Sequence, residues 1–305
     1  MLDSETKTKA MSKHLYIDNS AWNDEHTTFL PIADVKASIP LVDGKIIEAA
    51  GFKIEKHGGV EFHACVSTQA GCKFKCGMCK SGEAGFGRNL TQDEILHQVE
   101  HIRSMLNAEK LHHIVFMGIG EPLDNSKFPD ALEELIKKDS WYAGRLSLAT
   151  VGLVNRLEDF AKRQIPLNML WLSLHAPNDT KREKLMPVAA KASSVRQLID
   201  AGRKFRRSAN VREVRVNYLV YKGYNDSRQD AQELAELLKG THYDLTLQLT
   251  EPNGSKDIGY IPGVKEDIDR FMSYLREALV ENTIYRFLAA GKPLKGGCGE
   301  FAYTE

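Results

Sequence analysis

Several signals that assign a chain to a familiar class are absent from these 305 residues. No apolar run approaches the roughly 20 residues that a membrane-spanning helix needs. The N-terminus carries no apolar stretch typical of a secretory signal, so we expect a cytoplasmic protein with no membrane segment. Neither sign of charge is in excess, because 41 Lys and Arg residues balance 41 Asp and Glu residues. This balance argues against binding of nucleic acid through bulk charge.

Cysteine is scarce as well, and its few positions are Cys65, Cys72, Cys76, Cys79 and Cys298. An odd number, crowded between positions 72 and 79, does not suit a framework of structural disulfides in a reducing compartment. The crowding favours metal or redox chemistry instead. Hydrophobic residues are plentiful at 42%, which is enough for a large core in one or two domains.

Strand-like and helix-like segments alternate from about residue 60 onward, a pattern typical of βα units around a parallel sheet. We predict strands at 62–66, 113–117, 146–150, 169–174, 214–221 and 244–249, with a last strand at 283–288. A helix is expected after each of the six units, the first with a capping box of Thr91 and Glu94. Six units are too few for a closed eight-stranded barrel. We therefore expect an α/β fold, a partial (βα)6 TIM-like barrel with its functional residues at the strand carboxyl ends.

The first 60 residues have a different character. Segments 44–48 and 52–56 are strand-like, and His57-Gly58-Gly59 before Val60 is a hairpin signal. We therefore divide the chain into a short N-terminal β extension with a hairpin (1–60) and a barrel (61–305) that ends in a loop carrying Cys298.

The most informative motif is CxxxCxxC, formed by Cys72, Cys76 and Cys79 in the loop after the first barrel strand. Three thiolates can hold three irons of a 4Fe–4S cluster and leave the fourth iron open to another ligand. Structural zinc is the alternative, with His63 or His97 as its fourth ligand. A disulfide would leave one of the three thiols unpaired.

Further motifs accompany this one in a fixed order. They are Cys65-Val-Ser-Thr-Gln-Ala-Gly-Cys72, Gly85-Phe-Gly-Arg-Asn-Leu-Thr91, Met117-Gly-Ile-Gly-Glu-Pro-Leu123, Leu172-Ser-Leu-His-Ala-Pro-Asn-Asp179, Ile268-Asp-Arg-Phe271 and Gly297-Cys-Gly299. The set resembles the radical S-adenosylmethionine (SAM) superfamily, and within it the class A RNA adenine methyltransferases of the RlmN and Cfr family. The resemblance implies a barrel of the radical SAM type, with SAM bound to the open iron of the cluster.

The resemblance also implies SAM contacts at the ends of several strands. Gly120 and Glu121 would bind the methionyl amino group, although a Gly-Glu-Pro turn alone is a common structural feature. Ala149 stands where the family has a serine for the SAM carboxylate, so Thr150 or Ser147 would replace that contact. The nucleoside part of SAM would meet Ser173, Leu174, His175 and Asn253.

Two cysteines outside the motif fit the methyl-transfer chemistry of this family. Cys298 would accept a methyl group from one SAM, because thiolates are good nucleophiles. A radical from a second SAM would take a hydrogen from that methyl group, and the carbon radical would add to adenine. Glu48 would then accept a proton, and Cys65 would release the product by forming a disulfide with Cys298. The plainer interpretations are an exposed strand residue for Glu48 and a small buried residue for Cys65.

Substrate and partners are implied less directly. The family suggests ribosomal or transfer RNA methylated at carbon 2 or carbon 8 of adenine, and an electron donor such as flavodoxin or ferredoxin. We expect a monomer. We expect the family's additional N-terminal domain to be missing or reduced in the first 60 residues, which leaves a small-molecule or other non-ribosomal substrate as an alternative. A second alternative is a non-catalytic iron–sulfur or zinc RNA-binding module. Phosphate contacts could come from a basic stretch that contains Lys191, Arg196, Arg203, Lys204, Arg206, Arg207, Arg212 and Arg215.

Overall fold

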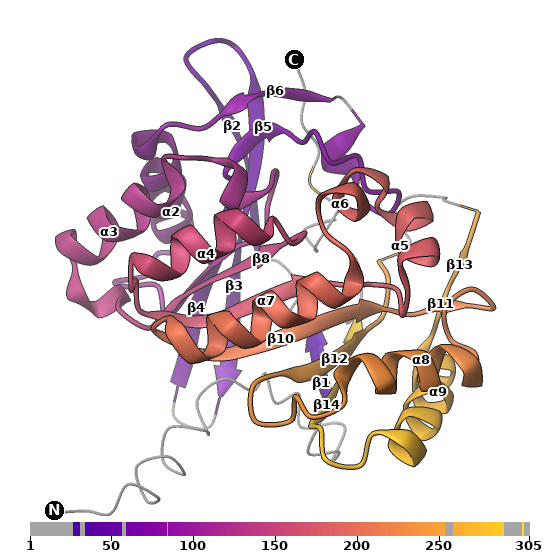
Figure 1. Cartoon of the computed structure of the whole chain (residues 1–305). Helices are drawn as coiled ribbons and strands as arrows, with labels where there is room; N and C mark the ends of the chain where they lie inside the picture. Colours follow the sequence, from indigo (N-terminus) through magenta and orange to yellow (C-terminus); the bar gives the residue numbers. More distant parts are fainter. Residues whose placement is uncertain are drawn as a thin grey trace, which may run out of the picture.

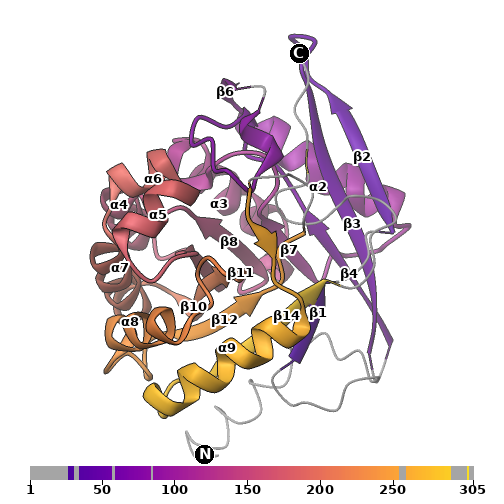
Figure 2. The same cartoon turned by 90° about the vertical axis from the view of Figure 1, so that its right-hand side faces the viewer.

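The computed structural model describes residues 27–30, 34–56, 59–83, 85–253, 259–289 and 301. A curved sheet forms the centre of this described part, as Figures 1 and 2 show. Its middle strands are all parallel and follow the order of the chain: β4 (Gly59–Cys65), β7 (His113–Phe116), β8 (Leu146–Thr150), β9 (Leu167–Ser173), β10 (Val211–Leu219), β12 (Thr246–Thr250) and β14 (Ile284–Ala289). Chain-order parallel strands are what successive right-handed βα units produce.

The outer strands leave this sheet open. β1 (Thr27–Leu30) pairs with β14 at one edge, and β2 (Val35–Pro40) pairs with β3 (Ile46–Lys56) at the other. The ten described strands of the sheet therefore run from β1 to β2 without closing into a ring. The predicted open, partial barrel is confirmed.

The strand β3 joins the N-terminal residues to the barrel. It pairs antiparallel with both β2 and β4, with Ala50 opposite Cys65. Segments 44–48 and 52–56 therefore contribute to one long strand rather than two, and β2 was not predicted. Side chains two positions apart share a face of a strand. Glu48, Ala50 and Cys65 consequently point to the same side of the sheet.

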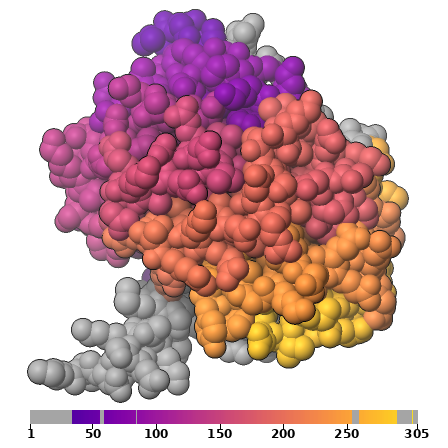
Figure 3. Space-filling view, viewed as in Figure 1, coloured from indigo at the N-terminus to yellow at the C-terminus, as the bar shows by residue number. Residues whose placement is uncertain are grey.

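Helices cover the outer, convex side of the sheet and hide it in the space-filling view of Figure 3. They are α2 (Gln92–Met105), α3 (Phe128–Lys138), α4 (Val154–Lys162), α5 (Asp179–Leu185), α6 (Pro187–Ala192), α7 (Val195–Ser208), α8 (Arg228–Leu238) and α9 (Lys265–Ala278). The capping box of Thr91 and Glu94 is present at the start of α2. Ser194 and Ser227 cap α7 and α8 in the same way, so local sequence sets these helix starts.

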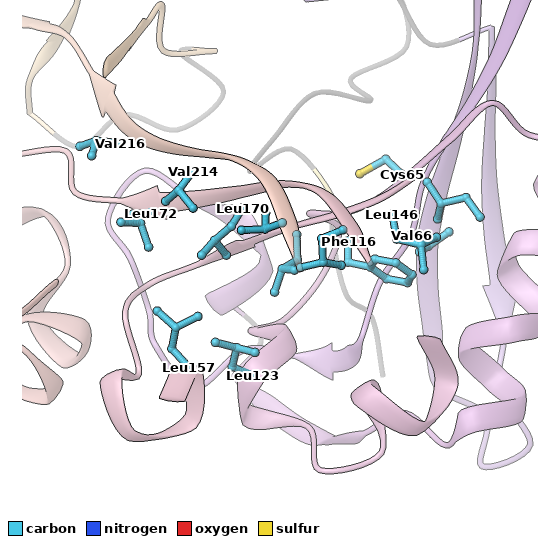
Figure 4. Packing of buried hydrophobic residues seen from close by; sticks show 14 of the residues in the cluster. Cys65, Val66, Phe116, Leu123, Leu146, Leu157, Leu170, Leu172, Val214 and Val216 are labelled. Carbon is cyan, nitrogen blue, oxygen red and sulfur yellow. The ribbon is translucent and has the colours of Figure 1, made fainter. Parts of the chain in front are cut away.

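The core lies between the sheet and these helices. Figure 4 shows Leu123 and Leu157 facing the strands that carry Leu170 and Leu172, and all four belong to one buried cluster. Alternate strand residues face the inside of the open barrel, where Arg215 and Gln248 are buried and hydrogen-bonded to each other. The barrel therefore has an apolar outer face and a polar interior.

Short elements complete the carboxyl ends of the strands: β5 (Gln69–Gly71), β6 (Phe86–Asn89), β11 (Tyr221–Lys222), β13 (Ile261–Pro262) and the 3-10 turns at Lys80–Gly82, Pro122–Asp124 and Ser140–Tyr142. The prediction of a strand from 244 was wrong by two residues, because the amides of Asp244 and Leu245 both bond to the Thr241 carbonyl in a turn. Among the described helices, none is long and apolar enough to span a membrane.

Candidate active site

The CxxxCxxC loop lies at the carboxyl end of the barrel, after β4 and β5. The Cys72 amide donates a hydrogen bond of 2.8 Å to the Gly85 carbonyl, which closes the base of the loop. Within the loop, the Cys79 amide donates to the Cys76 carbonyl at 3.1 Å. The three predicted iron ligands are therefore brought together on one short segment.

The environment of these thiols suits an iron–sulfur cluster. Burial raises the pKa of Cys72 to about 12 and that of Cys76 well above its usual range, and Cys79 adds to both shifts. The repulsion between ionised thiols shows that the three cysteines lie close enough to influence one another. Because the pKa values are raised, a bound metal must displace the thiol protons. Within the described ranges, no three Cys, His, Asp or Glu side chains converge on a single ion. A cubane cluster does not ask for that convergence, because each thiolate binds a different iron.

The histidines considered as zinc ligands have other neighbours. The Nε2 atom of His63 lies 3.0 Å from Oε2 of Glu61, and the ring of His97 stacks on His101. These contacts orient both rings through partners outside the cysteine loop.

Gly120 and Glu121 form a tight turn after β7. Gly120 has a φ of +105°, and a Cβ there would lie 2.6 Å from Cβ of Gln69, so the turn requires glycine. Gln69 in turn accepts a 2.9 Å hydrogen bond from the Glu121 amide. The buried Glu121 carboxylate accepts bonds from the amides of Val151 at 2.8 Å and Leu123 at 3.1 Å. Burial nevertheless raises its pKa to about 7, and a cationic amine beside it would favour the ionised form.

Thr150 lies beside this carboxylate at the end of β8. Its hydroxyl is hydrogen-bonded to Glu121 and accepts a 3.1 Å bond from the Gly152 amide. Ser147, the other candidate for the SAM carboxylate, lies three residues earlier, where its Oγ is 2.6 Å from Nε2 of His113. Of the two candidates, Thr150 is the one next to Glu121.

Ser173, Leu174 and His175 end β9 in an unusual backbone conformation. His175 has a φ of +58°, and its Nδ1 accepts a 3.2 Å hydrogen bond from the Leu219 amide. Burial, together with a smaller effect of the Arg182 charge, lowers the pKa of His175 to about 3. The ring is therefore neutral near pH 7, with its proton on Nε2, where it can donate to a ligand.

The other predicted residues lie at the same end of the barrel or outside the described residues. Cys65 ends β4 as a buried cysteine, shown beside Val66 in Figure 4. Asn253 is partly buried and follows β12. Cys298 lies outside the described residues, so its predicted disulfide with Cys65 does too.

A contact from the end of the chain reaches this region. Phe301 is buried, and its carbonyl accepts a 3.1 Å hydrogen bond from the hydroxyl of Ser81, two residues after Cys79. The Lys36 ammonium lies 5.7 Å from the centre of the Phe301 ring and 2.8 Å from Oε1 of Glu48. The residue three positions after Cys298 therefore bridges the cysteine loop and the Lys36–Glu48 ion pair.

Comparison with known proteins identifies this arrangement. The model of the Radical SAM superfamily matches residues 66–238, more than half of the chain. A relative from Clostridium novyi, named probable dual-specificity RNA methyltransferase RlmN, is 35% identical over 85% of this chain and 73% of its own length. A relative of the same name from Clostridium perfringens is 33% identical over 87% of this chain and 74% of its own. This chain belongs to the RlmN family of the radical SAM superfamily.

A solved structure agrees with that assignment. The crystal structure of a radical SAM methyltransferase from Sphaerobacter thermophilus matches with a TM-score of 0.77 and 30% identity, over 87% of this chain and 76% of that one. The chain is therefore a radical SAM methyltransferase, and the cofactors of its family are a 4Fe–4S cluster and SAM.

Several residues of the basic stretch that could contact phosphate have acidic or buried surroundings. Arg203 and Arg207 both pair with Asp244, and Lys204 lies 3.5 Å from Glu158. Arg215 is buried inside the barrel. Arg203, Lys204 and Arg207 thus form ion pairs with acids from distant parts of the chain.

Three residues near the site carried no signal in the sequence. Gln69 holds the Gly120–Glu121 turn, Lys36 pairs with Glu48, and Arg182 is buried between the cysteine loop and the strand ends. The last stands in a charged segment with Lys181 and Lys184, which conceals its burial.

Proposed function

We propose that this enzyme transfers a methyl group from SAM to an sp2 carbon of adenine in RNA, with Cys298 as the methyl carrier. The relatives named RNA methyltransferases support RNA as the substrate class. The observation that carries the proposal is the shared face of Glu48 and Cys65 beside the segment that follows Cys298. Binding of the cluster and of SAM does not by itself require Glu48 or Cys65.

In this proposal, Cys72, Cys76 and Cys79 bind the cluster, which with SAM supplies the radical that activates the methyl group. Glu121 receives the SAM ammonium, and the turn at Gly120 exposes backbone to it. The remaining SAM contacts are assigned to Thr150, Ser173, Leu174, His175 and Asn253, which lie at or just after strand ends.

The position of Phe301 supports a role for Cys298. Three residues of extended chain span at most about 11 Å. Because Phe301 is fixed by Ser81 and packs near Lys36, its tether keeps a carrier three residues away within reach of the cysteine loop and Glu48.

Glu48 and Cys65 act after the carbon–carbon bond has formed. Glu48 takes the proton from the adenine carbon, and Lys36 holds its carboxylate in place. The adduct radical also gives up one electron, which the cluster would accept. The Cys65 thiolate then attacks the Cys298 sulfur to give a disulfide, and the bond from that sulfur to the methylene carbon breaks. The carbon keeps the bonding pair and takes a proton, so the product leaves with a new methyl group. The two electrons of that disulfide must be returned by an external reductant before the next cycle.

We further propose that residues 1–60 form an N-terminal extension and that the enzyme acts as a cytoplasmic monomer. Its electrons come from a small donor such as flavodoxin or ferredoxin.

Mass spectrometry tests the carrier directly. Protein purified without oxygen and supplied with SAM should carry one added methyl group on the Cys298 peptide, and the Cys298→Ser variant should carry none. Unmodified Cys298 in protein that holds iron and SAM would contradict the carrier role.

Labelled SAM tests the substrate. With SAM that carries a CD3 group, total RNA should gain a methyl group that keeps two of its three deuterium atoms, because one hydrogen leaves with the radical. Label found only in small molecules would replace RNA with the alternative substrate class, and three retained deuterium atoms would exclude the radical route.

A further inference from the structure

Among the described residues, Arg182 is the largest side chain that is completely buried, with 0% of its surface exposed. It lies on α5, and the end of α5 is fastened to the cysteine loop by a 2.8 Å hydrogen bond from the Gly77 amide to the Leu185 carbonyl. Cys76 packs against the same small apolar cluster as Leu185. Figure 3 shows the surface of α5 and α6 directly adjoining that of the cysteine loop. The Arg182 charge is thus buried on a helix that packs against this loop.

Backbone carbonyls surround the Arg182 guanidinium. Nη2 donates to the carbonyl of Val151 at 2.6 Å and to that of Ser173 at 3.4 Å, at the ends of β8 and β9. Nη1 donates to the carbonyl of Ser193 at 2.9 Å and to that of Ala189 at 3.3 Å. The Nε atom has no partner within the described residues.

A buried guanidinium usually meets a carboxylate, because desolvation of a lone charge is costly. Here the described residues give Arg182 no ion pair. Of the two acids on its own helix, Glu183 is exposed, and Asp179 accepts a 2.7 Å hydrogen bond from the Val195 amide. Another acid, Glu121, accepts a hydrogen bond from the amide of Val151, the residue whose carbonyl accepts from Arg182. A full positive charge is therefore kept beside the cysteine loop without a fixed negative partner.

The contact between α5 and the loop lies next to one iron ligand in particular. The Gly77 amide that bonds to the Leu185 carbonyl directly follows Cys76 in the chain, and Cys76 packs against the same small cluster as Leu185. The Cys76 thiolate is therefore an anion beside the helix that carries Arg182.

We propose that Arg182 is the built-in counter-charge of the iron–sulfur cluster, and that it raises the cluster's reduction potential. The proposal rests on the cluster being bound by Cys72, Cys76 and Cys79, and does not depend on the substrate. One-electron reduction adds a negative charge to a cluster that already carries thiolates. A buried cation nearby stabilises the reduced form more than the oxidised form, because burial weakens dielectric screening.

Redox titration followed by electron paramagnetic resonance tests this in the reconstituted holoenzyme. Arg182→Gln should shift the midpoint potential of the cluster to more negative values, whereas Arg182→Lys, which keeps the charge, should stay closer to wild type. Arg286→Gln is the control, because Arg286 is also largely buried but forms an ion pair with Asp269 of α9. An unchanged potential in Arg182→Gln, or equal shifts in the Gln and Lys variants, would overturn the proposal.

A second pair of variants leaves Arg182 in place, in case its replacement prevents folding. The Ser193 hydroxyl is buried without a partner in the described residues, and the Ser193 carbonyl accepts a bond from Arg182. Ser193→Asp would pair the guanidinium, and Ser193→Asn is its neutral match in shape. The Asp variant should have the more negative potential at equal iron content, and equal potentials would refute a charge effect. Failure of the wild-type protein to bind iron would instead contradict the assignment of a cluster to Cys72, Cys76 and Cys79.

Discussion

The Lys36 ammonium forms an ion pair with the Glu48 carboxylate, with 2.8 Å between Nζ and Oε1. The two residues lie on adjacent antiparallel strands, and the same ammonium lies over the ring of Phe301. One cation therefore lies beside both the proposed proton acceptor and Phe301, three residues after the proposed methyl carrier.

Glu48→Gln should lower RNA methylation by about 10²–10⁴-fold, the usual contribution of a positioned general base. Methylation of Cys298 should be unchanged, because Glu48 acts only after the methyl carbon has joined adenine. Mass spectrometry should therefore find enzyme cross-linked to RNA that does not resolve. Normal turnover in this variant would leave Glu48 as an ordinary strand residue.

Lys36→Met should have a smaller effect, a loss of roughly tenfold in turnover, equivalent to about 1.4 kcal/mol in the transition state. The matched control is Lys45→Met, since Lys45 pairs with Asp43 at the tip of the β2–β3 hairpin. A positioning role predicts that Lys36→Arg restores most of the rate and that the Lys45 variant is unaffected. Equal losses in the two methionine variants would assign the effect to general destabilisation.

Phe301→Ala should lower the fraction of Cys298 that carries a methyl group, because the tether that keeps the carrier near the loop is lost. Iron content should be unaffected, since the backbone carbonyl of residue 301 that accepts from Ser81 is kept in the variant. Phe301→Leu keeps most of the buried volume and serves as the control. Full methylation of Cys298 in the alanine variant would argue against the tether.

The pKa of Glu121 predicts a pH dependence of stability. Burial raises this pKa from 4.5 to about 7, so the folded state binds the proton more tightly than the unfolded state. Stability should therefore fall by about 3 kcal/mol as pH rises from 4.5 to 7.5, relative to Glu121→Gln. Chemical denaturation of both proteins without SAM measures the difference. With SAM bound, the ammonium should flatten the slope, and a slope that SAM does not change would contradict the assignment of Glu121.

His175 should act in the opposite direction. Its pKa is lowered from 6.5 to about 3, chiefly by burial, so stability is complete above pH 6.5 and is lost as pH falls towards 3. The expected loss is roughly 5 kcal/mol. His175→Asn is the matched variant, because Asn tolerates a positive φ and its oxygen can accept the Leu219 amide in place of Nδ1. The variant should be less sensitive to acid, and an unchanged acid midpoint would show that the ring is not buried in its neutral form.

Much of the barrel could be predicted because its signals are local. Strand and helix periodicities gave the parallel units, and the hydroxyls of Thr91, Ser194 and Ser227 mark helix starts through bonds to residues three positions ahead. The cysteine loop is equally local. These features depend on spacing along the chain, which a sequence displays directly.

What escaped prediction depends on partners far apart in the chain. Arg182 looks like a surface residue until α5 packs against the loop at Gly77, and Arg207 looks like a phosphate ligand until Asp244 reaches it. The contact between Lys36 and Phe301 joins the two ends of the chain. Such pairs arise from tertiary packing, so no pattern within a short window reveals them.

Gly120→Ala tests the geometry of the SAM turn. The new Cβ would lie 2.6 Å from Cβ of Gln69, whose side chain holds the Glu121 amide, so the turn must move and carry Glu121 with it. We expect a loss of stability of about 1–3 kcal/mol from overpacking, and a loss of SAM affinity measured by calorimetry. Gly144→Ala is the control, because Gly144 also has a positive φ of +72° but nothing within 4 Å of its Cβ position. The control should lose about 1 kcal/mol of stability and keep its SAM affinity. Equal SAM affinity in the two variants would mean that the turn at Gly120 does not bind SAM.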